Sequence, residues 1–283
     1  MYKKLVADVS TLVSLPEVYL RLQDLLEKST TDAKNLGDVI SLDPALATRL
    51  LKIVNSSFYG FPGKIEDLDR AITITGIHEL ENLVLAASAS DVFDKIPSEL
   101  IDMPCFWHHS VYVGITAKLL GKHCGFEHAE RLFAAGLLHD VGQLILFNKE
   151  PDLARQALEK ALPTDDGLYH AEQEVFGFTH GDVGAELFRV WQLPAIFVEV
   201  AAFHHEPNHA INFSSAVGII HLANSLVNTE EPARNITECS STCVPEVLNI
   251  TRLSESELND ILTEVEVQFQ DVIKIISPNT PLL

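Results

Sequence analysis

The sequence predicts an all-α protein. Apolar residues recur at helical spacing along most of the 283 residues, and no alternating strand pattern extends beyond a few residues. Helix start signals support this prediction. Asp43 followed by Pro44 is typical of an N-cap and a first helical residue, and Pro16 suits the first turn of an earlier helix. At 47% hydrophobic residues, the chain is long and apolar enough to form a substantial core.

The expected helices divide the chain into three segments. Residues 1–95 form an N-terminal lobe of short helices, and residues 96–230 form a second helical lobe that begins with a linker over 96–105. Residues 231–283 form a C-terminal extension with one or two amphipathic helices, the last over 255–276. In the second lobe the expected helices span 111–124, 129–147, 151–162, 167–176, 181–191, 194–204 and 214–228.

The charge of the chain limits the partners that it can bind. With 20 Lys+Arg against 40 Asp+Glu, the formal net charge is −20. This balance argues against direct binding to nucleic acid, including by a helix-turn-helix in the N-terminal lobe, and against binding to an anionic membrane. No run approaches 18 uninterrupted apolar residues, so we expect no membrane span.

The cysteines and the N-terminus predict a cytoplasmic setting. Cys105, Cys124, Cys239 and Cys243 have the spacing of neither a zinc ribbon nor a disulfide scaffold, which favours a reducing compartment. The N-terminal residues lack the apolar segment of a signal peptide. The sequence does not predict an oligomeric state.

A histidine and an aspartate on consecutive residues, His139 and Asp140, lie within an apolar run that predicts a buried helix. A buried aspartate is unfavourable unless it is paired or binds a cation. Imidazole nitrogen and carboxylate oxygen can bind one ion together, so the pair indicates a metal site. The alternative, from the pair alone, is a core histidine that is capped by the neighbouring carboxylate.

Four further histidines, His109, His180, His204 and His205, lie near the ends of expected helices. Each alone is more typical of a structural residue or of a partner for a helix dipole. Together with His139 and Asp140 they suit one or two divalent transition-metal ions, with the aspartate bridging. Mixed imidazole and carboxylate ligands do not choose among Fe, Mn, Ni and Zn.

The sequence resembles the HD superfamily of metal-dependent phosphohydrolases and, within it, the HDOD family of bacterial signalling domains. The resemblance covers about residues 12–230 and implies an N-terminal helical lobe packed on an HD-type metal-binding lobe. The motifs that carry it are 42–46 (LDPAL), 50–60 (LLKIVNSSFYG), Ala71-Ile72 before Gly76, 106–110 (FWHHS), 136–142 (GLLHDVG), 174–180 (EVFGFTH) and 191–194 (WQLP).

The chain departs from two related patterns. Many HDOD members have lost the HD ligands, whereas this chain keeps the histidine and aspartate positions. The related HD-GYP phosphodiesterases have a lysine where this chain has Gln143, and their GYP loop is absent after His205. Their last aspartate ligand falls near Asn224, with His221 one turn earlier on the same helix face.

These departures favour metal binding over efficient hydrolysis. Asp140 is the only negatively charged ligand of this set and contributes one negative charge against the four positive charges of two divalent ions. The second ion is therefore expected to bind more weakly. Gln143 removes a cation that could hold a phosphate in the transition state. Whether His221 or Asn224 joins the metal site stays open at this point.

The sequence therefore predicts an HDOD-type signalling protein that retains an HD-type metal centre and binds a protein partner or a small phosphorylated ligand. The alternative is an active metal-dependent phosphohydrolase on a nucleotide or cyclic nucleotide, with His139 and Asp140 as catalytic residues through the metal. A third hypothesis is a structural interaction module without metal.

Overall fold

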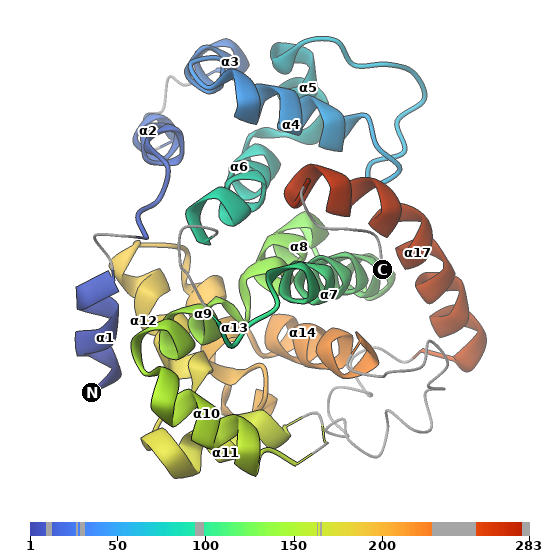
Figure 1. Ribbon diagram of the computed structural model, residues 1–283. Coiled ribbons are helices and arrows are strands. Elements are labelled where there is room, and N and C mark those ends of the chain that lie inside the picture. The colour runs from blue at the N-terminus through green and yellow to red at the C-terminus, as the bar shows by residue number, and fades with distance from the viewer. Residues whose placement is uncertain are drawn as a thin grey trace.

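The protein folds into helices, which confirms the all-α prediction (Figure 1). The computed structural model describes residues 1–9, 13–26, 28, 32–93, 99–162, 164, 166–227 and 253–278, and no strand occurs within these ranges. The helices are α1 (Tyr2–Val9), α2 (Glu17–Leu26), α3 (Ala33–Ile40), α4 (Pro44–Val54), α5 (Leu68–Thr75), α6 (Ile77–Phe93), α7 (Met103–His123), α8 (Ala129–Leu138), α9 (Val141–Lys149), α10 (Pro151–Lys160), α11 (Gly167–Phe176), α12 (His180–Val190), α13 (Ala195–Phe203), α14 (Ser214–Val227) and α17 (Glu255–Ile276), with a 3₁₀ turn at Pro207–His209.

Capping residues start several of these helices where the sequence predicts them. The Asp43 carboxylate accepts hydrogen bonds from the backbone N–H groups of Ala45 and Leu46 at the start of α4. Thr179 caps α12 in the same way and forms a capping box with Asp182, so α12 begins at His180, one residue before the expected start at 181. These local signals fix where each helix enters the fold.

Helices α7 and α8 form the centre of the molecule (Figure 1). Helices α2–α6 lie on one side of this pair, where α6 packs on α8, and α9–α14 lie on the other side. Buried apolar side chains of both predicted lobes belong to one continuous core. The first helix, α1, packs on α9 and α12, away from α2–α5.

Two glycines allow α7 and α8 to approach closely. A Cβ added at Gly136 on α8 would lie 2.8 Å from the Cα of Gly114 on α7. A Cβ added at Gly114 would lie 2.7 Å from the carbonyl oxygen of Phe133. The backbones therefore meet with no room for a side chain, and this contact fixes how α8 lies against α7.

The C-terminal helix α17 packs on α4, α6 and α7 and so joins the α2–α6 side to the central helix pair (Figure 1). A fully buried lysine, Lys118 on α7, supports this contact because its ammonium donates to the carbonyl oxygen of Phe58 and lies 3.4 Å from the side-chain oxygen of Gln268 on α17. Burial lowers the pKa of Lys118 to about 6.

Two helix boundaries differ from the sequence prediction by more than two residues. The expected helix over 129–147 is wrong, because it ends at Leu138 and a new helix begins at Val141, so that His139 and Asp140 lie at the break. Asp140 has φ −102° and ψ 3°, which turns the chain toward α12. The expected helix over 111–124 begins earlier, at Met103, because Asp102 caps it and Pro104 suits its first turn. His109 therefore lies within α7.

Some expectations concern residues that the structure does not describe. The first C-terminal helix, Cys239 and Cys243 fall within 228–252, and Pro97 of the linker falls within 94–98. Within the described part of the chain, no helix combines the length and apolar character that crossing a bilayer requires.

We expect Gly136→Ala to destabilise the protein by about 1–3 kcal/mol, because the added methyl group must separate α8 from α7. Urea unfolding followed by circular dichroism measures this change. Gly184→Ala is the matched control, since its Cβ would meet no atom closer than 3.6 Å. Equal stability of the two variants would show that the α7–α8 contact is not tight.

Candidate metal centre

The carboxylate of Asp140 lies between histidines that come from four different parts of the fold. Its Oδ2 is 3.3 Å from Nε2 of His139 and 3.7 Å from Nε2 of His109 on α7. Its Oδ1 is 3.2 Å from Nε2 of His180 on α12 and 3.3 Å from Nε2 of His204 after α13. Each carboxylate oxygen thus faces its own pair of imidazoles, as a bridging ligand does.

The fifth imidazole joins the Oδ1 side of the cluster. Nε2 of His205 is 3.2 Å from Nε2 of His180. The ligand atoms of Asp140, His180, His204 and His205 all lie within 4.8 Å of one another, and so do those of His109, His139 and Asp140. All six residues predicted from the sequence are therefore brought together, in two groups that share Asp140.

Two acidic residues orient the histidines on the Oδ1 side. His180 donates from Nδ1 to Oε2 of Glu172 on α11 at 2.7 Å, and His205 donates from Nδ1 to Oδ1 of Asp166 at 2.6 Å. These bonds place the proton on Nδ1 and direct Nε2 toward Asp140. A carboxylate behind an imidazole is the arrangement that fixes the tautomer of metal-binding histidines.

Backbone carbonyls orient two further histidines in the same way. Nδ1 of His139 donates to the carbonyl oxygen of Gly136 at 2.6 Å, and Nδ1 of His204 donates to that of Ala201 at 3.0 Å. Both side chains are fully buried. Their Nε2 atoms therefore carry lone pairs into the centre of the cluster.

Charges in the cluster keep Asp140 ionised. Burial alone would raise the pKa of its carboxyl, but His139 and the other imidazoles around it outweigh burial and hold the pKa well below its usual range. Burial and the neighbouring His139 lower the pKa of His109 to about 4. Burial also lowers the pKa of His204 and His205, so these rings favour the neutral form that binds a metal.

His180 behaves differently because it faces two carboxylates. Burial would lower its pKa, but Glu172 and Asp140 outweigh burial and raise the pKa to about 10. The His180 ring between Glu172 and Asp140 is therefore protonated when no metal ion is bound there.

The donor atoms of the cluster fit a divalent cation. Nε2 of His180 lies 3.3 Å from Nε2 of His204 and 3.2 Å from that of His205, so three ring nitrogens meet in one small volume. Nε2 of His139 and Oδ1 of Asp140 are buried and make no hydrogen bond of good geometry. Such orphaned acceptors are unfavourable in the apolar interior unless a cation lies between them.

Sequence reasoning missed Glu172 and Asp166. Glu172 is fully buried although it belongs to a largely polar helix, α11, and nothing in its local pattern distinguishes it from the exposed Glu174. The expectation that Asp140 alone supplies negative charge is therefore incomplete, because two further carboxylates lie directly behind the ligands.

Helix α14 passes the cluster, as the resemblance implied. His221 donates from Nδ1 to the carbonyl oxygen of His204 at 2.8 Å, so it supports the backbone of a ligand and lies outside the ligand groups. The Asn224 side chain faces His109 and favours its protonated form. Its buried Oδ1 has no hydrogen-bond partner.

A pocket of about 320 Å³ opens on one side of the cluster. His109, Asp140 and Gln143 line it together with Asp102 and mostly apolar residues, and neither lysine nor arginine is among its lining residues. Gln143 thus stands at the opening, where it can donate a hydrogen bond but no positive charge.

A comparison with known protein families shows to which family this chain belongs. The profile of the HDOD domain matches residues 12–207, which is most of the chain. The chain belongs to the HDOD domain family. All six residues of the metal cluster, from His109 to His205, lie within the matched range.

Three known proteins place this HDOD chain among relatives. An uncharacterized protein of Treponema pallidum (strain Nichols) is 26% identical over 203 residues, and the alignment spans 71% of this chain but only 39% of the relative. A proposed phosphohydrolase from Shewanella amazonensis SB2B has a TM-score of 0.74 at 23% identity, covering 96% of this chain and 98% of its own. An HDOD domain protein of unknown function from Geobacter sulfurreducens has a TM-score of 0.71 at 20% identity, covering 99% and 98%. These two structures share the fold.

We expect Glu172→Gln to weaken metal binding by about 10–100-fold. The neutral glutamine amide would replace the charged carboxylate that accepts the hydrogen bond from Nδ1 of His180. Metal titration of stripped protein by isothermal calorimetry measures the affinity. Glu174→Gln is the matched control, since Glu174 lies on the same helix, is exposed and pairs with Lys160. Equal affinity in both variants would contradict a role of Glu172 behind the ligand.

We expect Asn224→Asp to raise the affinity for metal, because the new carboxylate adds a second negative charge beside His109 with little change in volume. Thermal melting of stripped protein at increasing metal concentration measures the effect. If residue 224 does not face the metal, the buried carboxylate of the Asn224→Asp variant has no cation to pair with. The variant would then lose several kcal/mol of stability, on the order known for buried unpaired charges, with unchanged metal binding.

Proposed function

We propose that this HDOD protein is a cytoplasmic signalling protein that holds one or two divalent transition-metal ions and binds a small phosphorylated ligand or a protein partner. The observation that carries the proposal is the position of Asp140. Its two oxygens face two separate groups of imidazole Nε2 atoms, and those rings are oriented from behind. A structural role for His139 and Asp140 would not require four rings directed at one carboxylate, with a fifth beside them.

The residues that would hold the ions follow from the two groups. His109, His139 and Asp140 would hold one, and His180, His204 and His205 together with Asp140 would hold the other. Glu172 and Asp166 add negative charge behind the second group. Two divalent ions bring four positive charges against three carboxylates, which leaves the centre attractive to an anionic group of a ligand.

The pocket beside the cluster supports binding of a ligand more than its rapid turnover. A phosphate entering past Gln143 meets neither lysine nor arginine among the lining residues. Its charge would be balanced by the ions alone, and no cationic side chain lines the pocket to stabilise additional negative charge in a transition state. The apolar residues that line the rest of the pocket favour a ligand with an apolar part next to its phosphate.

The alternative function is phosphohydrolysis of a nucleotide or cyclic nucleotide. The open pocket at His109 and Asp140 favours it, since a substrate can reach the cluster, and the Shewanella amazonensis structure of the same fold is a proposed phosphohydrolase. A bound ion would supply a polarised phosphoryl oxygen and a more acidic water. His139 and Asp140 would then serve catalysis by holding the ion.

Metal analysis tests the proposal against a structural module without metal. Protein purified without chelator should carry one or more ions of Fe, Mn, Ni or Zn per chain, and Asp140→Ala should remove most of them. Asp152→Ala is the matched control, because Asp152 is exposed on α10. Less than about a tenth of an ion per chain after reloading would contradict the proposal.

Turnover separates the two metal-dependent functions. We expect metal-loaded protein to hydrolyse cyclic dinucleotides and simple nucleotides slowly or not at all, because Gln143 brings no positive charge to the pocket. Phosphate or nucleotide release followed by chromatography measures the rate. Turnover at or above about 1 s⁻¹, the low end of ordinary enzyme rates, would favour the phosphohydrolase instead.

A further inference from the structure

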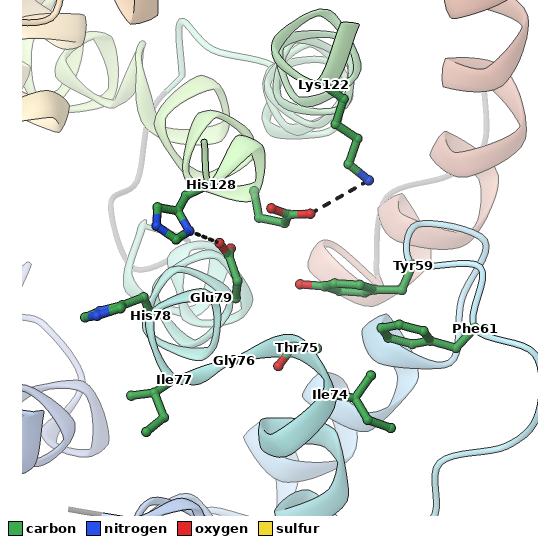
Figure 2. Close-up of a pocket in the computed structure, with 11 residues that line it drawn as sticks. Tyr59, Phe61, Ile74, Thr75, Gly76, Ile77, His78, Glu79, Lys122 and His128 are labelled. Carbon is green, nitrogen blue, oxygen red and sulfur yellow. Dashed lines mark ion pairs between the residues drawn. The ribbon is translucent and has the colours of Figure 1, made fainter. Parts of the chain in front are cut away.

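A second pocket lies at the start of α8, whereas the metal cluster lies at its end. Figure 2 shows the residues of this pocket. Its volume is about 400 Å³. Residues of the loop after α4, the corner between α5 and α6, the end of α7 and the start of α8 meet there. The lining residues are Tyr59, Phe61, Ile74, Thr75, Gly76, Ile77, His78, Glu79, Lys122, His128 and Glu130.

One wall of this pocket is aromatic. The rings of Tyr59 and Phe61 stack at 5.3 Å between centroids with 12° between their planes. Figure 2 shows the Tyr59 hydroxyl directed into the pocket toward Glu79. This hydroxyl is buried and has no hydrogen-bond partner, so the pocket contains a polar atom that its own residues do not satisfy.

The most unusual side chain in the pocket is Glu79, in the first turn of α6. Only 7% of the residue is exposed. Its Oε1 lies 3.3 Å from Nδ1 of His128, as the dashed line in Figure 2 shows. Its Oε2 is buried and accepts no hydrogen bond. A buried carboxylate oxygen without a donor is costly, which indicates that a donor from outside the chain belongs there.

A second carboxylate increases the negative charge of the pocket. Glu130 pairs with Lys122 at 3.8 Å, and the Lys122 side chain is about half exposed at the rim. Burial, Glu130 and Glu79 together raise the pKa of the Tyr59 hydroxyl, and burial and Glu130 raise the pKa of Glu79. The negative charges of Glu79 and Glu130 therefore both contribute to the electrostatic potential inside this pocket.

The backbone at the pocket is strained. His128 has φ 62°, a left-handed conformation that is uncommon for a residue other than glycine. It precedes α8 but makes no capping hydrogen bond, and its side chain turns to Glu79 instead. Strain of this kind concentrates at functional sites.

The charges and geometry exclude two classes of ligand. Within the described residues, three or more metal-ligating side chains come close enough to share an ion only around Asp140, so Glu79, His128 and Glu130 do not form such a group. An anion would face two carboxylates, and Lys122, which is the one lysine or arginine that lines the pocket, is already paired. A cation with several N–H donors remains.

We propose that this pocket binds a small guanidinium compound, whose planar head lies along the aromatic wall of Tyr59 and donates hydrogen bonds to Glu79. A guanidinium group matches a flat aromatic surface and a carboxylate at the same time, and it is less strongly hydrated than an ammonium group. The hydrogen bonds would satisfy the orphaned Oε2. An attached apolar chain would lie against Ile74 and Ile77, which line the same pocket.

Propylguanidinium chloride is the probe, titrated into the full chain by isothermal calorimetry. We expect saturable binding with a Kd of about 1 mM or tighter. Propylammonium chloride, which has the same chain but no planar head, should bind at least about tenfold more weakly. Absence of saturable binding of propylguanidinium up to about 10 mM, or equal binding of propylammonium, would overturn the proposal.

Variants locate the binding site. Glu79→Gln should weaken propylguanidinium binding at least tenfold, whereas Glu127→Gln removes the same charge from an exposed neighbour of His128 and should leave the Kd within twofold. Equal affinity of Glu79→Gln and the wild type would overturn the proposal. Circular dichroism checks the fold of each variant. If Glu79→Gln does not fold, Tyr59→Leu, which removes the aromatic wall, and Glu130→Gln decide, because unchanged affinity in both contradicts this site.

Discussion

A single buried carboxylate, that of Asp140, sets the arrangement of the second lobe. Its desolvation is costly, so the fold must surround it with polar groups that compensate. Helices α7, α12 and α13 and the break after α8 each bring an imidazole to it. Close backbone approach makes this convergence possible. A Cβ at Gly142 would lie 2.0 Å from the carbonyl oxygen of His180, so only glycine lets α12 begin beside Asp140.

Much of the fold could be predicted because its signals are local. Asp43, Pro44 and Thr179 cap or start helices through contacts within four residues, and a single sequence carries that information. The break between α8 and α9 could not be predicted in this way. After the break α9 packs against α12, a contact between residues far apart in the sequence, and apolar residues flank residues 139–140 on both sides without a turn signal.

The candidate centre was predictable for a different reason. Histidine and aspartate in an apolar run conflict with burial, and this conflict marks His139 and Asp140 in the sequence itself. Glu172 and Asp166 follow no such pattern, because their role depends on which imidazole each one meets in space. The second pocket was also unpredictable. The aromatic residues of the loop after α4 are visible in the sequence, but their position beside Glu79 depends on how α6 packs on α8.

Helix α8 has a consequence for how the two sites communicate. It begins next to His128 in the second pocket and ends next to His139 in the metal cluster, a span of ten residues or about 15 Å. The glycine contact with α7 leaves little freedom for one end to move without the other. A ligand that shifts α8 at one end would therefore act on the other end as well. Any factor by which a ligand at one end changes affinity at the other applies equally in the reverse direction.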